Sequence, residues 1–472
     1  MKSPFGLLSL VVITCLFAQS SLAGELRLAT FAIDASPEVG SPLAYDPTKE
    51  VTWPLSCRGV VLTGADKPIV LCAVDWIGIA NDSSRLFRQK LADATGTTID
   101  RVAVHTLHQH DAPRCDFGAA KILAKYNAEK VHYDVEFLHE VIDRAAAAAK
   151  ASLQTSTSIT SLAIGAAEVN DVASNRRMLD AEGKVAITRY TACKDPKIRS
   201  LPVGVIDPML RLVTFYQGEK PVAVITTYAT HPQSYYRTGG ANPDFPGMAR
   251  DMRQETTGVF HLHFNGAGGN IGAGKFNDGS RENRQVLADK VADAMRRAWE
   301  SQTKTPITAD DVGWNSVAVL LPAAAHLDGE ALAKEIASEA TPPALRGHAA
   351  DKLSFSNSLK SGEKITIGCL SLGDTRVLFM PGELFVEYQL AAQQMRPDQN
   401  VLMAAYGDYG PFYIGTRIAY WQGGYETSER ATNVSPEVEQ VLTTAIATLL
   451  EVPDTQVRPN DFTDTTGPGL PQ

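Results

Sequence analysis

The chain has 472 residues, 44% of them hydrophobic, so it can bury a large core as one big domain or as two closely packed ones. Its formal net charge of -9 and its pI near 5.6 argue against nucleic acid as a partner, because phosphate backbones bind to basic surfaces. The sequence also lacks the Lys/Arg runs that would attract it to an anionic membrane surface.

The N-terminus has the pattern of a bacterial export signal. Lys2 precedes an apolar stretch over residues 5–18, and the small residues among 21–23 offer a cleavage point before Gly24. We therefore predict a signal peptide over residues 1–23 and a periplasmic or extracellular mature protein. Lipidation of Cys15 is the weaker alternative, because the residues just before it are not small. No later stretch reaches ~20 consecutive apolar residues, so we expect no transmembrane segment in the mature chain.

Beyond the signal peptide the sequence contains five cysteines, an odd number with no CxxC spacing. This content is far below that of a disulfide scaffold, so the fold must depend on its apolar core. The sequence leaves room for one or two disulfides and does not reveal their connectivity.

Short β-branched runs alternate with longer helical patterns, which favours an α/β fold of mixed sheets with flanking helices. Strands are predicted over residues 26–33, 59–62, 69–74, 102–106, 209–216, 222–228, 259–264, 365–370 and 377–380. Helices are predicted over residues 83–94, 135–152, 283–300, 329–339, 383–395 and 436–450. We predict a mobile insertion over residues 340–360, one catalytic domain over residues 24–455 and a flexible tail over residues 456–472.

Three of the ten histidines stand close together at the end of the predicted strand 102–106, namely His105, His108 and His110. Imidazole is the commonest metal ligand and titrates near neutral pH, so this cluster indicates metal or proton-transfer chemistry. The alternative is a polar loop in which histidines occur by chance.

Two further strand ends carry polar side chains. His231 follows the predicted strand 222–228 and precedes Pro232, which favours an extended turn. Ligands in α/β sheets gather at the carboxyl ends of strands, so His231 is a candidate to join the cluster. Glu383 follows a Pro-Gly break and is predicted to open a helix, where a carboxylate also interacts favourably with the helix dipole without any catalytic duty.

Aromatic residues alternate with glycines over residues 406–416 and again over residues 421–426. Such a segment can line a pocket while the backbone turns tightly around a ligand. An aromatic packing loop is the more frequent alternative.

Together these segments resemble the neutral ceramidase N-terminal domain family. The matching residues occur in the family's order and rough spacing: His108-Gln109-His110-Asp111-Ala112-Pro113, Thr230-His231-Pro232, Pro381-Gly382-Glu383 and residues 413–425. The resemblance implies a neutral-ceramidase-like α/β catalytic domain. It also implies a zinc amidase whose metal is bound by two histidines, a glutamate and a tyrosine.

Carried over residue by residue, the resemblance implies the metal ligands His108, His231, Glu383 and Tyr413. The family's His-Thr-His-Ser-Gly-Pro signature bears a ligand on its first histidine and a catalytic or substrate-binding histidine on its second, which matches His110. Tyr425 keeps the family's interval of twelve residues from the tyrosine ligand to an active-site tyrosine. Arg176 matches an arginine that follows an asparagine and contacts the reacting group.

Two neutral imidazoles and one carboxylate form a common catalytic zinc set, and an open position lets the metal lower the pKa of a bound water. We therefore predict Zn²⁺ as the cofactor and attack of a metal-bound water on an amide bond of a small-molecule or lipid N-acyl substrate. His110 would pass a proton to the leaving amine, while Arg176 and Tyr425 would stabilise the oxyanion.

Two departures from the family bear on the mechanism and the substrate. The family's Gly-Asp-Val-Ser-Pro-Asn loop corresponds to residues 269–274, which contain no serine, so a serine acyl-enzyme is not expected. The same glycine-rich stretch lacks the Gly-Lys-Ser/Thr ending of a P-loop, and we interpret it as a tight turn under the zinc site. We also expect no C-terminal immunoglobulin-like domain of the kind that full ceramidases carry.

The substrate is therefore not carried over by name. An esterase or a carbohydrate deacetylase on the same site stays open, as does a non-catalytic exported binding protein that contains the metal. The native metal and the participation of His105 stay open too, and no protein partner is predicted.

Overall fold

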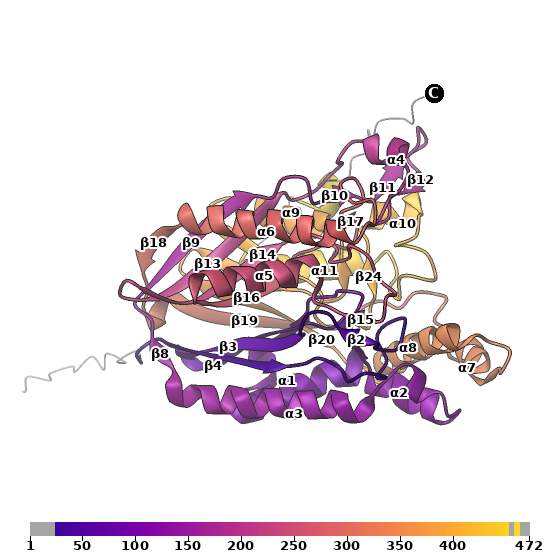
Figure 1. Ribbon diagram of the computed structural model, residues 1–472, viewed down its shortest axis with the longest axis horizontal. Coiled ribbons are helices and arrows are strands. Elements are labelled where there is room, and N and C mark those ends of the chain that lie inside the picture. Colours follow the sequence, from indigo (N-terminus) through magenta and orange to yellow (C-terminus); the bar gives the residue numbers. More distant parts are fainter. Residues whose placement is uncertain (1–23, 453–456, 463–472) are drawn as a thin grey trace, which may run out of the picture.

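The computed structural model describes residues 24–452 and 457–462, in which three large β-sheets are covered by helices (Figure 1). The predicted signal peptide over residues 1–23 and most of the predicted tail over residues 456–472 lie outside the described residues. No helix of the described part is long and apolar enough to cross a membrane. The predicted α/β class, with mixed sheets and flanking helices, is confirmed.

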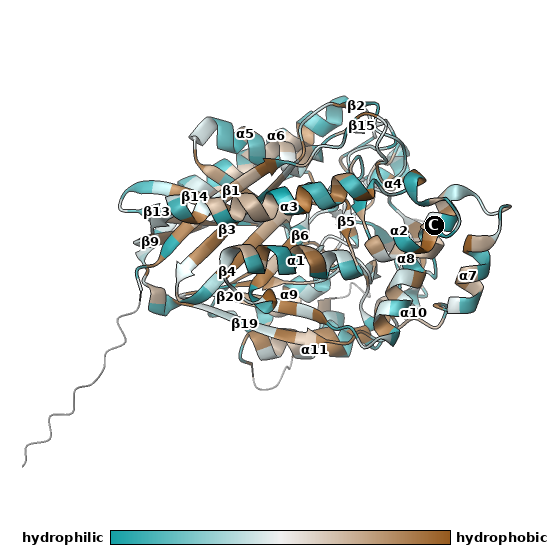
Figure 2. Ribbon diagram, turned by 90° about the horizontal axis from the view of Figure 1, so that it is seen from below, coloured by the Kyte–Doolittle hydropathy of each residue, from teal (hydrophilic) through white to brown (hydrophobic). Residues whose placement is uncertain are grey.

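The first sheet has the strand order β6-β4-β3-β1-β8. Its strands are β1 (Arg27–Asp34), β3 (Ser56–Gly64), β4 (Asp66–Val74), β6 (Val102–Thr106) and β8 (Thr157–Ser158). Only β4 and β6 pair in parallel. Two helices lie side by side on its outer face (Figure 2), α1 (Asn81–Thr95) and α3 (Val135–Ser152). The buried residues of α3 recur at helical spacing on one face: Leu138, Val141, Ile142, Ala145 and Ala149.

The second sheet has the strand order β16-β14-β13-β9-β18. Its strands are β9 (Ser161–Glu168), β13 (Met209–Gln217), β14 (Lys220–Tyr228), β16 (Phe260–Asn265) and β18 (Thr303–Pro306). Here β14 and β16 form the parallel pair. Its outer face is covered by α5 (Asp244–Thr257) and α6 (Glu282–Glu300).

The third sheet has the strand order β19-β20-β21-β23. Its strands are β19 (Val312–Val319), β20 (Ile365–Leu372), β21 (Thr375–Phe379) and β23 (Asn400–Ala404). Again one pair is parallel, β21 with β23. It contacts α9 (Val386–Met395) and α11 (Val438–Leu449).

The three sheets meet along a shared apolar core and at the carboxyl ends of their parallel edge strands. Side chains from all three sheets belong to one buried cluster, for example Val60, Val213 and Leu370. The backbone N–H of Thr106, just after His105, donates to the carbonyl of Tyr406 over 2.9 Å, and the N–H of Ala405 donates to Asn265 over 2.9 Å. The loops that follow β6, β14, β16, β21 and β23 therefore leave the sheets at the same end of the molecule.

The remaining helices are α2 (Phe117–Ala124), α4 (Pro196–Ser200), α7 (Gly329–Ala337), α8 (Pro343–Lys360) and α10 (Arg417–Gln422). Short strands pair as β2 (Glu50–Val51) with β15 (Gly240–Ala241), β5 (Gly78–Ile79) with β7 (Arg114–Cys115), β10 (Ser174–Asn175) with β17 (Ile271–Gly272), β11 (Arg177–Leu179) with β12 (Val185–Thr188), and β22 (Glu383–Leu384) with β24 (Tyr413–Ile414). Within the predicted tail, residues Pro459–Phe462 form a 3₁₀ turn that contacts α9.

Two of the predictions on elements are wrong. The predicted insertion over residues 340–360 is helix α8, whose buried face consists mostly of small and polar residues and so gives a weak apolar period. Its Asp351 is buried and pairs with Arg114 over 2.7 Å. Glu383 does not open a helix: it forms strand β22, and α9 begins at Val386.

All five cysteines of the described residues are buried and free. The sulfur atoms of Cys57 and Cys72 lie 3.5 Å apart on neighbouring strands without a disulfide between them. The described fold is therefore held by its apolar core.

Candidate metal centre

His108 lies two residues beyond the end of β6, in a left-handed backbone conformation with φ of +64°. Its ring is buried, and Nδ1 is 2.6 Å from the carbonyl oxygen of Ile77. This contact assigns the proton to Nδ1 and leaves the lone pair on Nε2, the form in which imidazole binds a metal. Nε2 has no hydrogen-bond partner among the described residues and lies 3.2 Å from Oε2 of Glu383.

Glu383 reaches the same point from the short strand β22, which follows β21 of the third sheet. Strand β22 pairs in parallel with β24, so that Glu383 is the register partner of Tyr413. The preceding Gly382 has φ of +60°, and a Cβ there would stand 2.6 Å from the carbonyl of Phe412, so this turn requires glycine. The Tyr409 hydroxyl donates to Oε1 over 2.8 Å, which fixes the carboxylate and leaves Oε2 free to bind a cation.

His231 and His110 complete the cluster. Nδ1 of His231 is 3.8 Å from Oε2 of Glu383, and its Nε2 is 2.9 Å from Nε2 of His110. On its other side, His110 has Nδ1 3.2 Å from the hydroxyl of Tyr45. One ring nitrogen from each of His108, His110 and His231 lies within 4.8 Å of the other two.

The residues present fit a metal ion. Three buried atoms face one another without a hydrogen-bond partner among the described residues: Nε2 of His108, Nδ1 of His231 and Oε2 of Glu383. Polar atoms left unpaired in a protein interior cost free energy, whereas one bound cation would satisfy all three. Imidazole nitrogen and carboxylate oxygen are ligands of Zn²⁺. The three histidines without Glu383 are the geometric alternative.

The pKa values of His110 and His231 are held well below the ordinary range, first by burial and then by the neighbouring histidine and arginine charges. Both rings are therefore neutral at neutral pH, as metal ligation and proton acceptance require.

Tyr413 lies beside His231, with the ring planes parallel within 2° and the centroids 6.2 Å apart. Its hydroxyl accepts a hydrogen bond from Nη1 of Arg176 over 3.2 Å. Burial and the Glu383 carboxylate raise the pKa of the phenol, while Arg176 acts in the opposite direction. A divalent cation beside this oxygen would also favour the phenolate.

Arg176 and Tyr425 lie on the same side of the cluster. The guanidinium carbon of Arg176 is 5.8 Å from the ring centroid of Tyr413 and 6.0 Å from that of Tyr425. Nε of Arg176 faces Oε1 of the fully buried Glu426 at 3.4 Å. The structure therefore brings all seven predicted site residues into one region: His108, His110, Arg176, His231, Glu383, Tyr413 and Tyr425.

Several residues that surround the cluster were not predicted from the sequence. Tyr406 stacks on His108 with centroids 4.5 Å apart, and its buried hydroxyl has no partner among the described residues. Tyr409, Tyr45 and Glu426 hold Glu383, His110 and Arg176, respectively. The aromatic and glycine pattern of residues 406–416 was the only sequence signal for Tyr406 and Tyr409. Nothing in the local sequence indicated Tyr45.

The glycine-rich loop packs against the segments that carry the cluster. The N–H of Gly269 donates to the carbonyl of Leu384 over 2.8 Å, and a Cβ at Gly269 would stand 2.3 Å from the carbonyl of Glu383. The carbonyl of Asn270 accepts from the N–H of Arg176, and the carbonyl of Ile271 accepts from the N–H of His231. This turn therefore joins the backbones of two predicted site residues, Arg176 and His231, and of Leu384, which directly follows Glu383.

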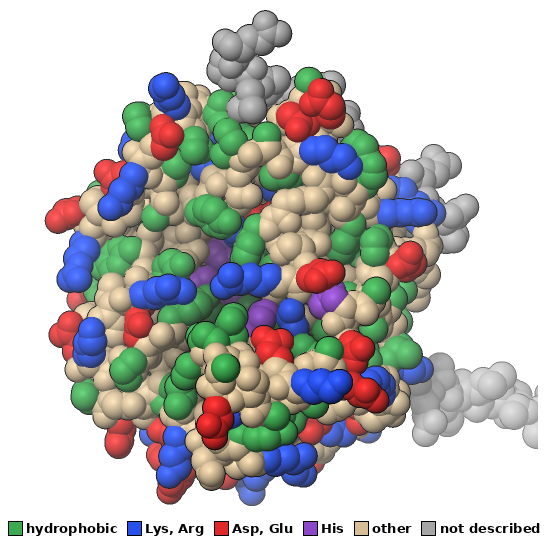
Figure 3. Space-filling model, turned by 90° about the vertical axis from the view of Figure 1, so that its right-hand side faces the viewer, with side chains coloured by type: hydrophobic (Ala, Val, Ile, Leu, Met, Phe, Trp, Pro, Cys, Tyr) green, Lys and Arg blue, Asp and Glu red, His purple; other side chains and the backbone are tan. Residues whose placement is uncertain are grey.

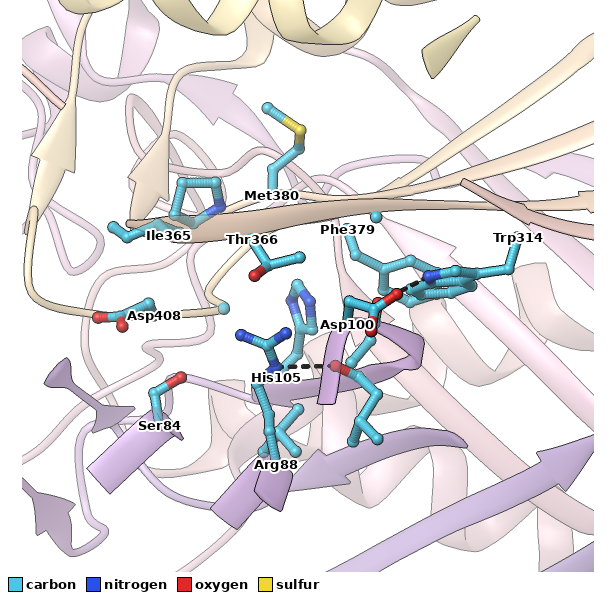
Figure 4. Close-up of a pocket in the computed structure, with 16 residues that line it drawn as sticks. Ser84, Arg88, Asp100, His105, Trp314, Ile365, Thr366, Phe379, Met380 and Asp408 are labelled. Atoms are coloured by element: carbon cyan, nitrogen blue, oxygen red, sulfur yellow. Dashed lines mark hydrogen bonds between the residues drawn. The ribbon is translucent and has the colours of Figure 1, made fainter. Parts of the chain in front are cut away.

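His105 lies apart from the cluster. Its Nδ1 is 2.7 Å from the carbonyl oxygen of Ala405, and its ring packs against Phe264 and Phe379. It lines a separate cavity of about 30 Å³ together with Arg88, among other residues (Figure 4). Burial lowers the pKa of His105 to about 4, as expected for a neutral structural histidine.

The end of the molecule at which these loops leave the sheets has a depression on its surface. In it, histidine side chains lie among hydrophobic and Lys or Arg side chains (Figure 3). The most accessible ring of the cluster is His110, which is 8% exposed, whereas His108 and His231 are 1% exposed. A ligand that enters from solvent therefore meets His110 first.

Comparison with protein-family models found no match, and comparison with curated proteins found none either. Solved structures do match. Neutral ceramidase from Pseudomonas aeruginosa superimposes with a TM-score of 0.64 at 15% identity, covering 91% of this chain and 75% of that one. A ceramidase complexed with C2 gives a TM-score of 0.63 at 15% identity, covering 92% of this chain and 77% of that one. At this identity the likeness shows the fold alone, and the chain has a ceramidase-like fold.

Proposed function

We propose that this protein is a zinc-dependent hydrolase that cleaves the amide bond of an N-acyl substrate. The observation that carries the proposal is the set of unpaired buried atoms on His108, His231 and Glu383, which face one another within a ceramidase-like fold. Such an arrangement would only destabilise a purely structural core, because each buried polar atom loses its contact with water and gains no hydrogen-bond partner.

We assign the metal to His108, His231, Glu383 and Tyr413. Zinc bound there would act as a Lewis acid and lower the pKa of a water molecule. Tyr409 supports the set by holding Oε1 of Glu383, and the carbonyl of Ile77 supports it by holding Nδ1 of His108. Partners of this kind fix the orientation of ligand side chains.

His110 is assigned to proton transfer. It is the most accessible of the three clustered histidines, its low pKa keeps it neutral, and Tyr45 orients its ring through the contact at Nδ1. A neutral imidazole at this point can accept a proton from the attacking water and pass it to the leaving amine.

Arg176 and Tyr425 are assigned to the oxyanion that develops on the scissile carbonyl. Glu426 and Tyr413 hold the guanidinium of Arg176, and Tyr425 lies against the same guanidinium. Donors that are already in place cost no reorganisation when the charge forms. The export-signal pattern of residues 1–23 supports the further proposal that the protein meets its substrate after export.

The test is a panel of N-acyl amides and matched esters, assayed for acid release with and without a metal chelator. The proposal predicts amide hydrolysis that the chelator abolishes and that added zinc restores. Faster turnover of the ester, or of an acetylated sugar, would instead identify an esterase or a deacetylase on the same site. Zinc binding without turnover of any substrate would identify a binding protein and overturn the proposal.

A further inference from the structure

The mouth of the candidate metal centre carries the guanidinium of Arg237. Arg237 is exposed, and among the described residues its side chain forms no ion pair. Its guanidinium carbon lies 5.1 Å from the ring centroid of Tyr45 and 5.3 Å from that of Tyr236. In a protein of net charge -9, a cation left free at this place needs an explanation.

The two tyrosines connect Arg237 to the proton-transfer residue. Tyr45 stacks on His110 with centroids 5.6 Å apart, and Tyr236 meets the same ring edge to face at 5.4 Å. The rings of Tyr45 and Tyr236 are themselves 5.1 Å apart. The rings of Tyr45 and Tyr236 therefore lie between Arg237 and His110. Their cation–π contacts restrict the orientation of the Arg237 guanidinium.

The backbone of Arg237 adopts an unfavourable conformation that a hydrogen bond supports. Its φ is +64°, a conformation that an arginine rarely adopts. Its N–H donates to Oδ1 of Asp111 over 3.0 Å, while Oδ2 of Asp111 accepts from Arg284 over 3.1 Å. Asp111 directly follows His110, so one buried carboxylate fixes the proton-transfer loop and the Arg237 loop together.

We propose that Arg237 binds an anionic group on the amine half of the substrate, so that the protein acts on N-acyl amino acids or similar anionic amides. This inference rests on the proposed function, because it uses the assignment of His110 to the leaving amine. A guanidinium offers a planar pair of donors that matches a carboxylate, and a phosphate on the amine would have the same charge chemistry.

The experiment compares three substrates with one acyl chain: N-dodecanoylglycine, N-dodecanoylethanolamine and N-dodecanoylphosphoethanolamine. The wild-type protein should show a higher kcat/KM for the anionic substrates than for the neutral one. If kcat/KM is higher for the glycine conjugate than for the phosphoethanolamine conjugate, the preferred anion is a carboxylate. The reverse order of kcat/KM identifies a phosphate.

The decisive variant is Arg237→Asn, because asparagine tolerates the left-handed backbone and removes the charge. The ratio of kcat/KM between the glycine and the ethanolamine conjugate should fall about tenfold. Arg237→Lys should restore part of this ratio, and about 1 M salt should reduce it in the wild type because charges are then screened. Lys150→Ala, which removes a positive charge from the exposed side of α3, serves as the matched control.

An equal ratio in the wild type and in Arg237→Asn would overturn the role of Arg237 while leaving the hydrolase intact. Hydrolysis of none of the amides would overturn the proposed function instead. In that case calorimetric binding of N-dodecanoylglycine still decides: about tenfold weaker binding to Arg237→Asn supports the anion site, and equal binding contradicts it.

Discussion

The predicted metal ligands are held through atoms that do not face the metal position. His108 uses Nδ1 to reach Ile77, and Glu383 uses Oε1 to reach the Tyr409 hydroxyl. Each contact leaves one lone-pair atom directed at the centre of the cluster. Neighbours of this kind fix the orientation of ligand side chains and raise their basicity, so residues that never touch the metal also shape the site.

At the residue scale the ligands and the oxyanion donors can be separated. His231→Ala and Glu383→Ala should each lose both bound zinc and activity, because each removes a ligand atom. Tyr425→Phe should keep zinc and lower kcat by about a hundredfold, the usual effect of removing one oxyanion donor. Zinc per chain, measured by elemental analysis alongside the rate, checks this; full zinc in both alanine variants would refute the ligand assignment.

His110 gives a second test at this scale. It lies 2.9 Å from His231 and belongs to the three-histidine alternative, yet we assign it to proton transfer. His110→Ala should therefore retain zinc and lose most of its activity. Zinc loss as complete as in His108→Ala would show that the metal is bound by the three histidines.

At the element scale, the glycine-rich turn after β16 positions the site through backbone contacts. Gly269→Ala would place a Cβ 2.3 Å from the carbonyl of Glu383, so the backbone must move. We expect a loss of about 1–3 kcal/mol in the free energy of unfolding, together with weaker zinc binding. Gly313→Ala in β19 is the control, because its nearest contact would be 3.6 Å. Equal stability and zinc affinity of the two variants would refute the role of the turn.

The start of α2 gives a pH-dependent prediction at the same scale. Asp116 caps this helix by accepting from the N–H of Ala119, and its burial raises its pKa to about 8. The folded state then holds the proton more tightly than the unfolded state, whose pKa lies near 4. This group's stabilisation is fully present below pH 4 and is lost as the pH rises through about 8.

Urea unfolding of the wild type and of Asp116→Asn at pH 5 and pH 8 measures this effect. The stability of the wild type relative to the variant should fall between the two pH values, by no more than about 1.4 kcal/mol per pH unit. A difference that does not change with pH would show that Asp116 has an ordinary pKa in the folded protein.

At the scale of the whole molecule, three sheets with one parallel pair each bring distant segments to a common end. Their edge strands β6, β16 and β23 are joined there by backbone hydrogen bonds, and the segments that follow these strands and β14 and β21 carry most of the candidate site. No single segment forms the site, which exists only when the sheets are packed together.

The nine predicted strands and six predicted helices all correspond to elements of the structure, because their apolar residues recur with a strong period. The sequence did not predict the strands β9, β19 and β23 or the helix α5. It failed at α8, whose buried face is small and polar, and at Glu383, where pairing with Tyr413 overrides the helix signal. The site residues were predicted through the family resemblance that their motifs carry, and their roles stay predictions. Tyr45 could not be predicted, because its contact with His110 joins residues 65 positions apart in the chain.

A crystal structure with anomalous scattering recorded at the zinc edge tests the central claim most directly. The account predicts one zinc peak at about 2.0–2.2 Å from ligand atoms of His108, His231 and Glu383, with the Tyr413 oxygen completing the set. A peak bound by His110 in place of Glu383, or no peak in zinc-soaked crystals, would contradict it.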